Sequence, residues 1–173
     1  MRSRWRRLVA SLLVVVAAAC SRFGASATPQ SLHRFVSSES PITQSGVTSA
    51  EGGWKITRDA AGSVPLFEVP AAPGLQQTTL TYRARLKASD VRGRAFLEMW
   101  VRVPGRGEFF SRGLDQPLQG SSEWATYEIP FFLNEPGLRP DLVKLNVAFE
   151  GGGGTLWVKD IQLLQAPLAA PAG

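Results

Sequence analysis

One stretch of alternating residues, 93–103, constrains the fold of this chain more than any other. Its odd-numbered positions from 95 on are Ala, Leu, Met, Val and Val, and the positions between them are Phe96, Glu98, Trp100 and Arg102. This two-residue period predicts a β-strand with one apolar face and one face that mixes aromatic and charged side chains. A lone strand is not stable in water, and an apolar face needs a second layer to cover it. The stretch therefore predicts a two-layer β fold.

The same period recurs along the rest of the chain. Residues 79–87 alternate between Leu, Tyr, Ala, Leu on one face and Thr, Arg, Arg, Lys on the other, and residues 142–150 and 155–164 also alternate. Shorter candidate strands, separated by Gly- and Pro-rich turns, are 32–36, 54–57, 64–69, 109–112 and 124–132. After the first 20 residues, no window of 11 residues has a convincing helical period. We therefore predict an all-β domain of about eight or nine antiparallel strands.

The first 20 residues have the features of an export signal. Four arginines within residues 2–7 precede an apolar run at 8–19, which is shorter than the roughly 20 residues that a membrane-spanning helix needs. The ending Ala-Ala-Ala-Cys resembles the lipobox of bacterial lipoproteins, although that family usually has leucine in place of Ala17. The resemblance implies a lipid on Cys20, which would anchor the chain in a membrane. The alternative is an ordinary signal peptide, cut near Ala19 or at residues 25–27.

The leader also explains the basic charge of the chain. The sequence has 19 Lys and Arg against 14 Asp and Glu, and without the four leader arginines 15 basic residues remain. The mature chain is thus close to neutral and lacks the basic stripe typical of nucleic-acid-binding proteins. Cys20 is the only cysteine, so no intramolecular disulfide can form and a hydrophobic core must stabilise the fold.

These features divide the chain into four predicted segments. They are a lipoprotein signal peptide at 1–19, a lipid-anchored flexible tether at 20–30, a β-sandwich domain at 31–165 and a disordered tail at 166–173. The residue after Cys20 is Ser21 rather than the aspartate that favours retention in the inner membrane during enterobacterial lipoprotein sorting. The expected location is therefore the bacterial cell envelope, with the anchor in the outer membrane.

Four stretches resemble the galactose-binding-like jelly-roll domains that many carbohydrate-binding modules use. They are 80–87, 93–103, 120–129 (Gly-Ser-Ser-Glu-Trp-Ala-Thr-Tyr-Glu-Ile) and 154–163 (Gly-Thr-Leu-Trp-Val-Lys-Asp-Ile-Gln-Leu). The resemblance implies a jelly-roll β-sandwich. It does not imply a single function, because this fold hosts sugar, lipid, protein and purely structural roles.

The outward residues of the two clearest strands form the candidate ligand-binding site, which comprises Arg83, Arg85, Glu98, Trp100 and Arg102. An indole face can stack on the C–H patch of a sugar ring, and guanidinium groups can donate hydrogen bonds to its hydroxyls. The alternative is a set of ordinary cross-strand charge pairs, with Trp100 covered by a loop.

Other notable side chains are expected to be structural. Trp54, Trp124 and Trp157 are assigned to core or sheet-edge packing. His33 is the only histidine and no Gly-x-Ser-x-Gly motif is present, so the sequence offers neither a catalytic triad nor a histidine-based metal site. Glu98 and the carboxylate at 128 could act as a glycosidase pair, but ordinary surface carboxylates are commoner.

We therefore predict a non-catalytic, lipid-anchored binding module of the cell envelope that takes carbohydrate or another polar envelope ligand. The alternative is a structural lipoprotein that docks a protein partner and binds no small molecule. Neither alternative needs a metal or cofactor. The expected partners are the membrane, through a lipid at Cys20, and either a carbohydrate or an envelope protein, but not nucleic acid.

Overall fold

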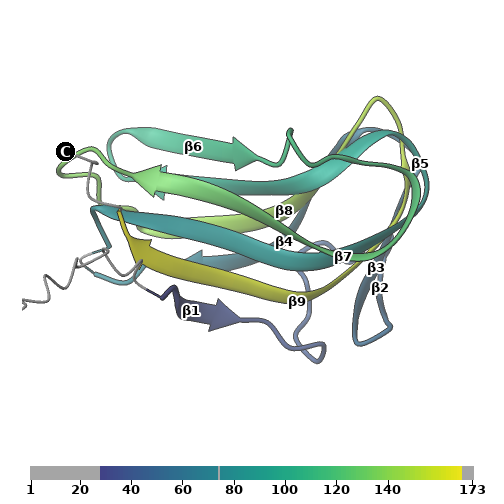
Figure 1. Ribbon diagram of the computed structural model, residues 1–173, viewed down its shortest axis with the longest axis horizontal. Coiled ribbons are helices and arrows are strands. Elements are labelled where there is room, and N and C mark those ends of the chain that lie inside the picture. The colour runs from purple at the N-terminus through teal and green to yellow at the C-terminus, as the bar shows by residue number, and fades with distance from the viewer. Residues whose placement is uncertain (1–27, 74, 169–173) are drawn as a thin grey trace, which may run out of the picture.

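The computed structural model describes residues 28–73 and 75–168, which form nine strands (Figure 1). The strands are β1 Gln30–Arg34, β2 Val47–Ala50, β3 Gly53–Arg58, β4 Gly62–Pro70, β5 Thr78–Val103, β6 Gly107–Arg112, β7 Leu118–Leu133, β8 Leu142–Glu150 and β9 Gly154–Pro167. All of their pairings are antiparallel, which confirms the predicted all-β sandwich of about eight or nine strands. The predicted signal peptide, Cys20 and most of the tether lie outside the described residues. Within the described part there is no helix long and apolar enough to cross a membrane.

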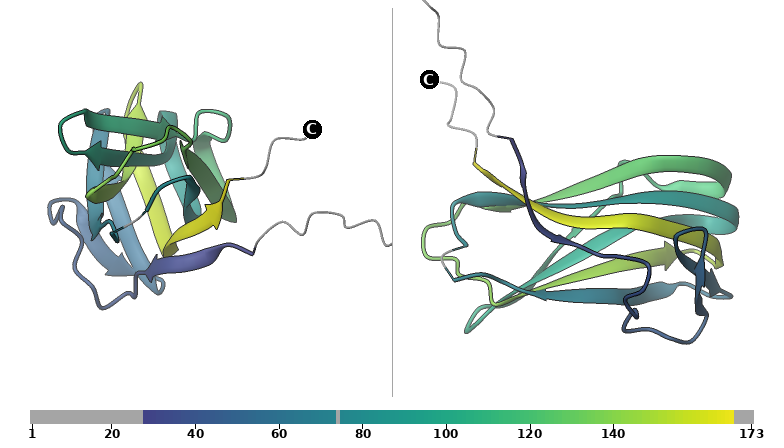
Figure 2. Two further views of the ribbon diagram at one scale, coloured as in Figure 1. Left: turned by 90° about the vertical axis from the view of Figure 1, so that its left-hand side faces the viewer. Right: turned by 90° about the horizontal axis from the view of Figure 1, so that it is seen from below.

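The two clearest predicted strands, 79–87 and 93–103, are the two halves of one strand, β5, which is 26 residues long. Along one edge, β5 pairs first with β9 and then with β8. Along the other edge it pairs first with β7 and then with β6. One strand thus belongs to both layers. The first layer has the order β2-β3-β9-β5-β7, with β1 beside β9, and the second has the order β4-β8-β5-β6 (Figures 1 and 2).

The passage between the layers lies at a bend in β5. Asp90 and Gly93 have φ angles of 54° and 80°, in the left-handed region that bends the strand. A Cβ at Gly93 would overlap the backbone of Glu150 and Gly151 on the neighbouring hairpin. Glycine is therefore required at position 93 both for its backbone conformation and for the close approach of the hairpin.

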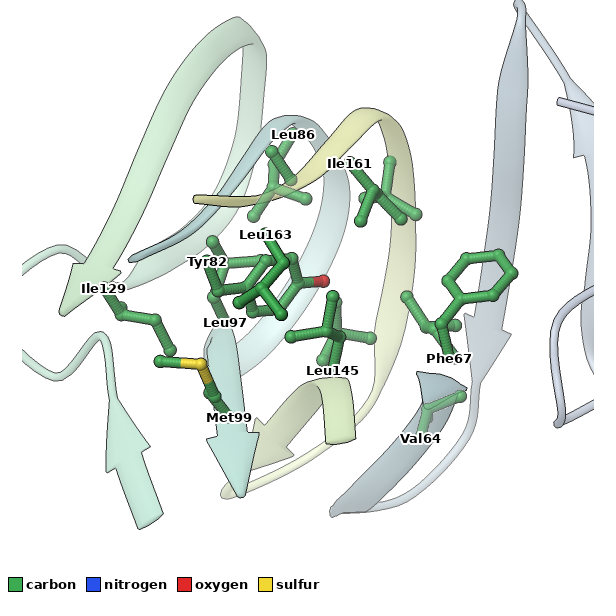
Figure 3. Close-up of a cluster of buried hydrophobic side chains, with 14 of the residues drawn as sticks. Val64, Phe67, Tyr82, Leu86, Leu97, Met99, Ile129, Leu145, Ile161 and Leu163 are labelled. Carbon is green, nitrogen blue, oxygen red and sulfur yellow. The ribbon is translucent and has the colours of Figure 1, made fainter. Parts of the chain in front are cut away.

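Side chains from both halves of β5 fill one core. The inner faces contribute Leu80, Tyr82, Ala84, Leu86, Ala95, Leu97, Met99, Val101 and Val103, none more than 4% exposed. Figure 3 shows residues of both halves in one cluster with side chains of β4, β7, β8 and β9. Because both inner faces point into this core, the outward residues of the two halves point away from each other. That arrangement decides which predicted site residues can meet.

The strand limits differ from the predicted ones at several places. The Ser-, Thr- and Pro-rich segment 37–49 predicts a loop or weak edge strand, and its end forms β2, an edge strand that pairs with β3 through all four of its residues. β7 begins six residues before the expected start at Trp124. β9 reaches Pro167, two residues into the segment expected as a disordered tail, and the hydroxyl of Thr78 donates a hydrogen bond of 2.5 Å to the Ala166 carbonyl there.

Candidate functional site

The five residues of the predicted site do not form one cluster. Arg83 and Arg85 lie in the half of β5 that belongs to the first layer, whereas Glu98, Trp100 and Arg102 lie in the half that belongs to the second. The sequence pattern predicts one outer face for both stretches only if they are neighbouring strands of one sheet. As halves of a single strand that changes layers, they face in different directions.

The sequence pattern predicts that Glu98 is exposed. In the structure it is buried, with a side chain that is 0% exposed. Its Oε1 accepts hydrogen bonds from Ser63 Oγ at 2.6 Å and Asn146 Nδ2 at 3.1 Å, and its Oε2 accepts one from Arg112 Nε at 2.7 Å. Burial alone would raise the pKa of this carboxyl. The hydrogen bonds from Ser63, Trp100, Asn146 and Arg112 together outweigh burial and hold the pKa below its usual value. Glu98 is therefore a fixed negative charge.

An aromatic pair lies next to this charge. The rings of Trp100 on β5 and Phe110 on β6 have centroids 5.0 Å apart and planes tilted by 44°. Phe110 is 54% exposed, and Trp100 is half-buried, so their apolar surface is open to solvent. Arg102 lies further along β5, where it donates two hydrogen bonds to Asp141, at 2.8 and 3.0 Å. Its guanidinium is thus already engaged.

Glu98 and Trp100 line a groove of about 400 Å³ on the outer face of the second layer, here called the β5–β8 groove, whereas Phe110 and Arg102 are not part of its lining. It crosses all four strands of that layer, and its lining comprises Ile42, Ser63, Pro65, Glu68, Glu98, Trp100, Glu108, Arg112, Lys144 and Asn146. Lys144 forms an ion pair of 2.6 Å with Glu108 at one side. The lining holds three carboxylates against two cations. The groove is therefore slightly negative, and two ion pairs, Arg112 with Glu98 and Lys144 with Glu108, hold four of its five charged groups in place.

Of the groove lining, sequence reasoning identifies only Glu98 and Trp100, and it misses the side chains that contact them. Ser63 comes from β4 and reaches Glu98 through the pairing of β4 with β8, and Arg112 comes from the next strand, β6, and reaches Glu98 through the pairing of β6 with β5. Phe110 is recognisable in the sequence only as part of a short strand. Register supplies the missing information, because Phe110 is the residue directly opposite Trp100, and Arg112 is the residue directly opposite Glu98.

On the outer face of the first layer, Arg83 pairs with Glu128 at 2.5 Å, and Arg85 lies over the Trp124 ring at 5.8 Å. Glu128 and Glu98 thus lie on different layers, so they cannot flank one glycosidic bond as a catalytic pair. Trp54 is buried as predicted. Trp124 is half-buried on β7, the edge strand of this layer, whereas Trp157 is half-buried on the outer face of β9, in neither the core nor a sheet edge, which corrects the expectation for Trp157. In the described residues no group of three or more His, Cys, Asp and Glu could hold a metal ion.

No protein-family model matches the sequence, and a comparison with curated proteins finds no match. Several solved structures are similar in fold. A family 16 carbohydrate-binding module has 10% identity and a TM-score of 0.49, with 74% of this chain and 92% of that chain covered. The family 11 carbohydrate-binding module of the cellulosomal cellulase Lic26A-Cel5E of Clostridium thermocellum has 13% identity and a TM-score of 0.47, with 84% and 99% covered. A cyclase from Fischerella sp. TAU has 10% identity and a TM-score of 0.47, with 76% and 74% covered. The similar structures thus include both binding modules and an enzyme.

Proposed function

We propose that this protein is a non-catalytic carbohydrate-binding module of the bacterial cell envelope, and that the β5–β8 groove is its ligand site. One observation carries the proposal: half-buried Trp100 lines an open groove beside the buried, hydrogen-bonded carboxylate of Glu98, and its ring packs against the exposed ring of Phe110. A large aromatic surface left in water is costly unless a ligand covers it.

The chemistry of the groove matches a sugar. The faces of the two rings offer apolar surface to the C–H patch of a pyranose. Hydroxyl groups of the sugar can donate to the carboxylates of Glu68 and Glu108 and accept from Arg112 and Lys144. These groups differ from ordinary surface charges because strands hold them in register and ion pairs fix several of them, so that little conformational entropy is lost when a ligand binds.

The charge of the groove narrows the ligand to neutral saccharides. Three carboxylates, one of them buried and ionised, would repel a uronic acid or a sulfated sugar, and the two cations are already paired with Glu98 and Glu108. A neutral polyol meets no such repulsion and can use both donors and acceptors of the lining.

The test is calorimetric titration of the chain with neutral oligosaccharides such as mannohexaose, cellohexaose and laminarihexaose. Trp100→Ala and Phe110→Ala should each weaken binding by about 1 kcal/mol or more, which is about fivefold. Phe132→Ala is the matched control, since this phenylalanine is 57% exposed but lies on β7 in the first layer, whereas Phe110 packs against Trp100 of the groove. Thermal melts of all variants provide the stability control. If no neutral glycan binds at millimolar concentration, the proposal fails and the protein-docking alternative takes its place.

The anchor is part of the same proposal and rests on the sequence of residues 17–20. In a bacterial host, the protein should incorporate labelled palmitate and partition into detergent. Cys20→Ala should abolish both, and a variant that still takes up label would contradict the anchor. Attachment at Cys20, about ten residues before β1, would leave the groove free to reach envelope polysaccharide.

A further inference from the structure

The outer face of the first layer carries a ladder of alternating lysine and tryptophan side chains. It runs across four adjacent strands, from Lys55 on β3 through Trp157 on β9 and Lys87 on β5 to Trp124 on β7. Lys55 and Lys87 each lie directly opposite Trp157 in the strand register. Their ammonium nitrogens are 5.4 and 4.5 Å from the centre of its ring.

Two further cations extend this ladder. Lys159 Nζ lies 4.1 Å from the centre of the Trp124 ring, and Arg85, which is opposite Lys159 in the register, lies 5.8 Å from it. Lys87 Nζ is also 5.5 Å from that ring. The two indole rings thus have the charged groups of four side chains within about 6 Å of their centres. A cation fixed in this way loses less rotamer freedom when it meets an anion than a freely rotating lysine does.

The charges on this face are not balanced by neighbours. Glu51 pairs with Lys87 and accepts a hydrogen bond from Trp124 Nε1 at 3.2 Å, and Glu128 pairs with Arg83. Within residues 28–73 and 75–168, no salt bridge engages Lys55, Arg85 or Lys159. The same is true of Arg34, which borders a hollow together with Arg83 and Arg85. The nearby carboxylates without a salt bridge are Glu123 and Asp160, so cations predominate.

We infer that this face is a second binding site, and that its occupant is an anionic polysaccharide, a chain of sugars bearing carboxylate, sulfate or phosphate groups. Charge complementarity favours an anion, and half-exposed indole rings between the cations offer apolar edges to sugar rings. An anionic membrane surface would match the charge as well. However, the one exposed large hydrophobic residue on the outer face of the described β7 is Phe132, which lies eight residues along the strand from Trp124, so no exposed apolar side chain lies beside the ladder to insert into a bilayer.

The test uses the full chain immobilised through a C-terminal tag, with alginate and dextran sulfate as anionic probes and unmodified dextran as the neutral one. Alginate and dextran sulfate should bind, and the affinity should fall steeply between about 50 and 300 mM salt because the contacts are electrostatic. The triple variant Lys55→Gln, Arg85→Gln, Lys159→Gln should weaken anionic binding by about tenfold or more. The matched control is Arg94→Gln, Arg106→Gln, Arg139→Gln, which removes the same charge elsewhere and should bind as the unmodified chain does.

Three outcomes would overturn this inference. Equal losses in the two triple variants would mean that net charge alone attracts the polymer. No binding of either anionic probe at low salt would mean that the ladder only stabilises the sheet. Binding to phosphatidylglycerol vesicles that the ladder variant abolishes, without binding to either polysaccharide, would assign the face to a membrane. The neutral oligosaccharides of the β5–β8 groove provide a separate readout: the ladder variant should still bind them, so failure at one site can be told from failure at the other.

Discussion

The loss of stability in Glu98→Ala can test whether Glu98 is buried, as the structure shows, or exposed, as the sequence pattern predicts. Truncation removes a carboxylate that accepts hydrogen bonds from Ser63, Asn146 and Arg112. Breaking a buried ion pair costs about 3 to 5 kcal/mol, because the remaining charge is left without a partner. The Arg112 side chain is 33% exposed and can recover some hydration, so the lower end of that range applies. The two neutral donors lose partners as well. We therefore expect Glu98→Ala to lower the free energy of unfolding by about 3 kcal/mol.

The assay is urea denaturation at pH 7, followed by tryptophan fluorescence and by far-UV circular dichroism. Leu97→Ala, on the inner face one residue away, should lose about 2 to 5 kcal/mol, a loss comparable with that of Glu98→Ala. Glu68→Ala supplies the control, because Glu68 is an exposed carboxylate of the same groove, and surface changes of this kind stay within about 0.5 kcal/mol. A loss of stability below about 0.5 kcal/mol for Glu98→Ala would refute the buried hydrogen-bond network and indicate that Glu98 is exposed.

Three further predictions follow from buried or strained groups. The hydroxyl of Tyr82 is buried without a hydrogen-bond partner among the described residues, and burial raises its pKa. Tyr82→Phe should therefore leave the free energy of unfolding unchanged or raise it by up to about 1 kcal/mol. A loss of about 2 kcal/mol or more would mean that the hydroxyl has a partner. Gly93→Ala should lower the free energy of unfolding by about 2 kcal/mol or more in the same assay, since a Cβ there overlaps the Glu150 carbonyl; an unchanged midpoint would contradict the bend. The pKa of Glu98 lies below its unfolded value of about 4.3, so the stability due to its ionisation is present above that pH and is lost as the pH falls through the folded-state pKa. The stability difference between the unmodified protein and Glu98→Gln should therefore shrink in melts below about pH 4, and a constant difference would exclude an ionised Glu98.

Much of the fold could be predicted because alternation is a local property of the chain. The strand at 142–150 has the limits of β8, and the inward residues from Leu80 to Leu86 and from Ala95 to Val103 are all buried. The two-residue period cannot show whether two consecutive alternating stretches, such as 79–87 and 93–103, are separate strands or parts of one strand. Residues 88–92 fall between the two predicted strands, yet every one of them is part of β5, because pairing with β7 and β9 continues into the bend.

The site was harder to predict for the same reason. Alternation correctly assigns Glu98 to the face opposite Leu97, but it does not show whether that face is open. The answer depends on Ser63, Asn146 and Arg112, which come from three other strands. Likewise, the basic and aromatic residues around Trp124 look unremarkable along the sequence, because they lie on β3, β5, β7 and β9 and meet only when these strands pair side by side.

The continuity of β5 also has a consequence for how the domain unfolds. Since one uninterrupted strand provides the centre of both layers, neither layer can open without withdrawing hydrogen-bond partners from the other, and the two should melt in a single cooperative transition. Folding should be slow for the same topological reason. β5 must pair with β9, whose Ala166 lies opposite Thr79, and β9 must also receive β1 from the other end of the domain. Pairing such distant segments costs loop-closure entropy before the contacts between them form. We therefore expect this chain to fold in milliseconds to seconds, as other β proteins with distant pairings do.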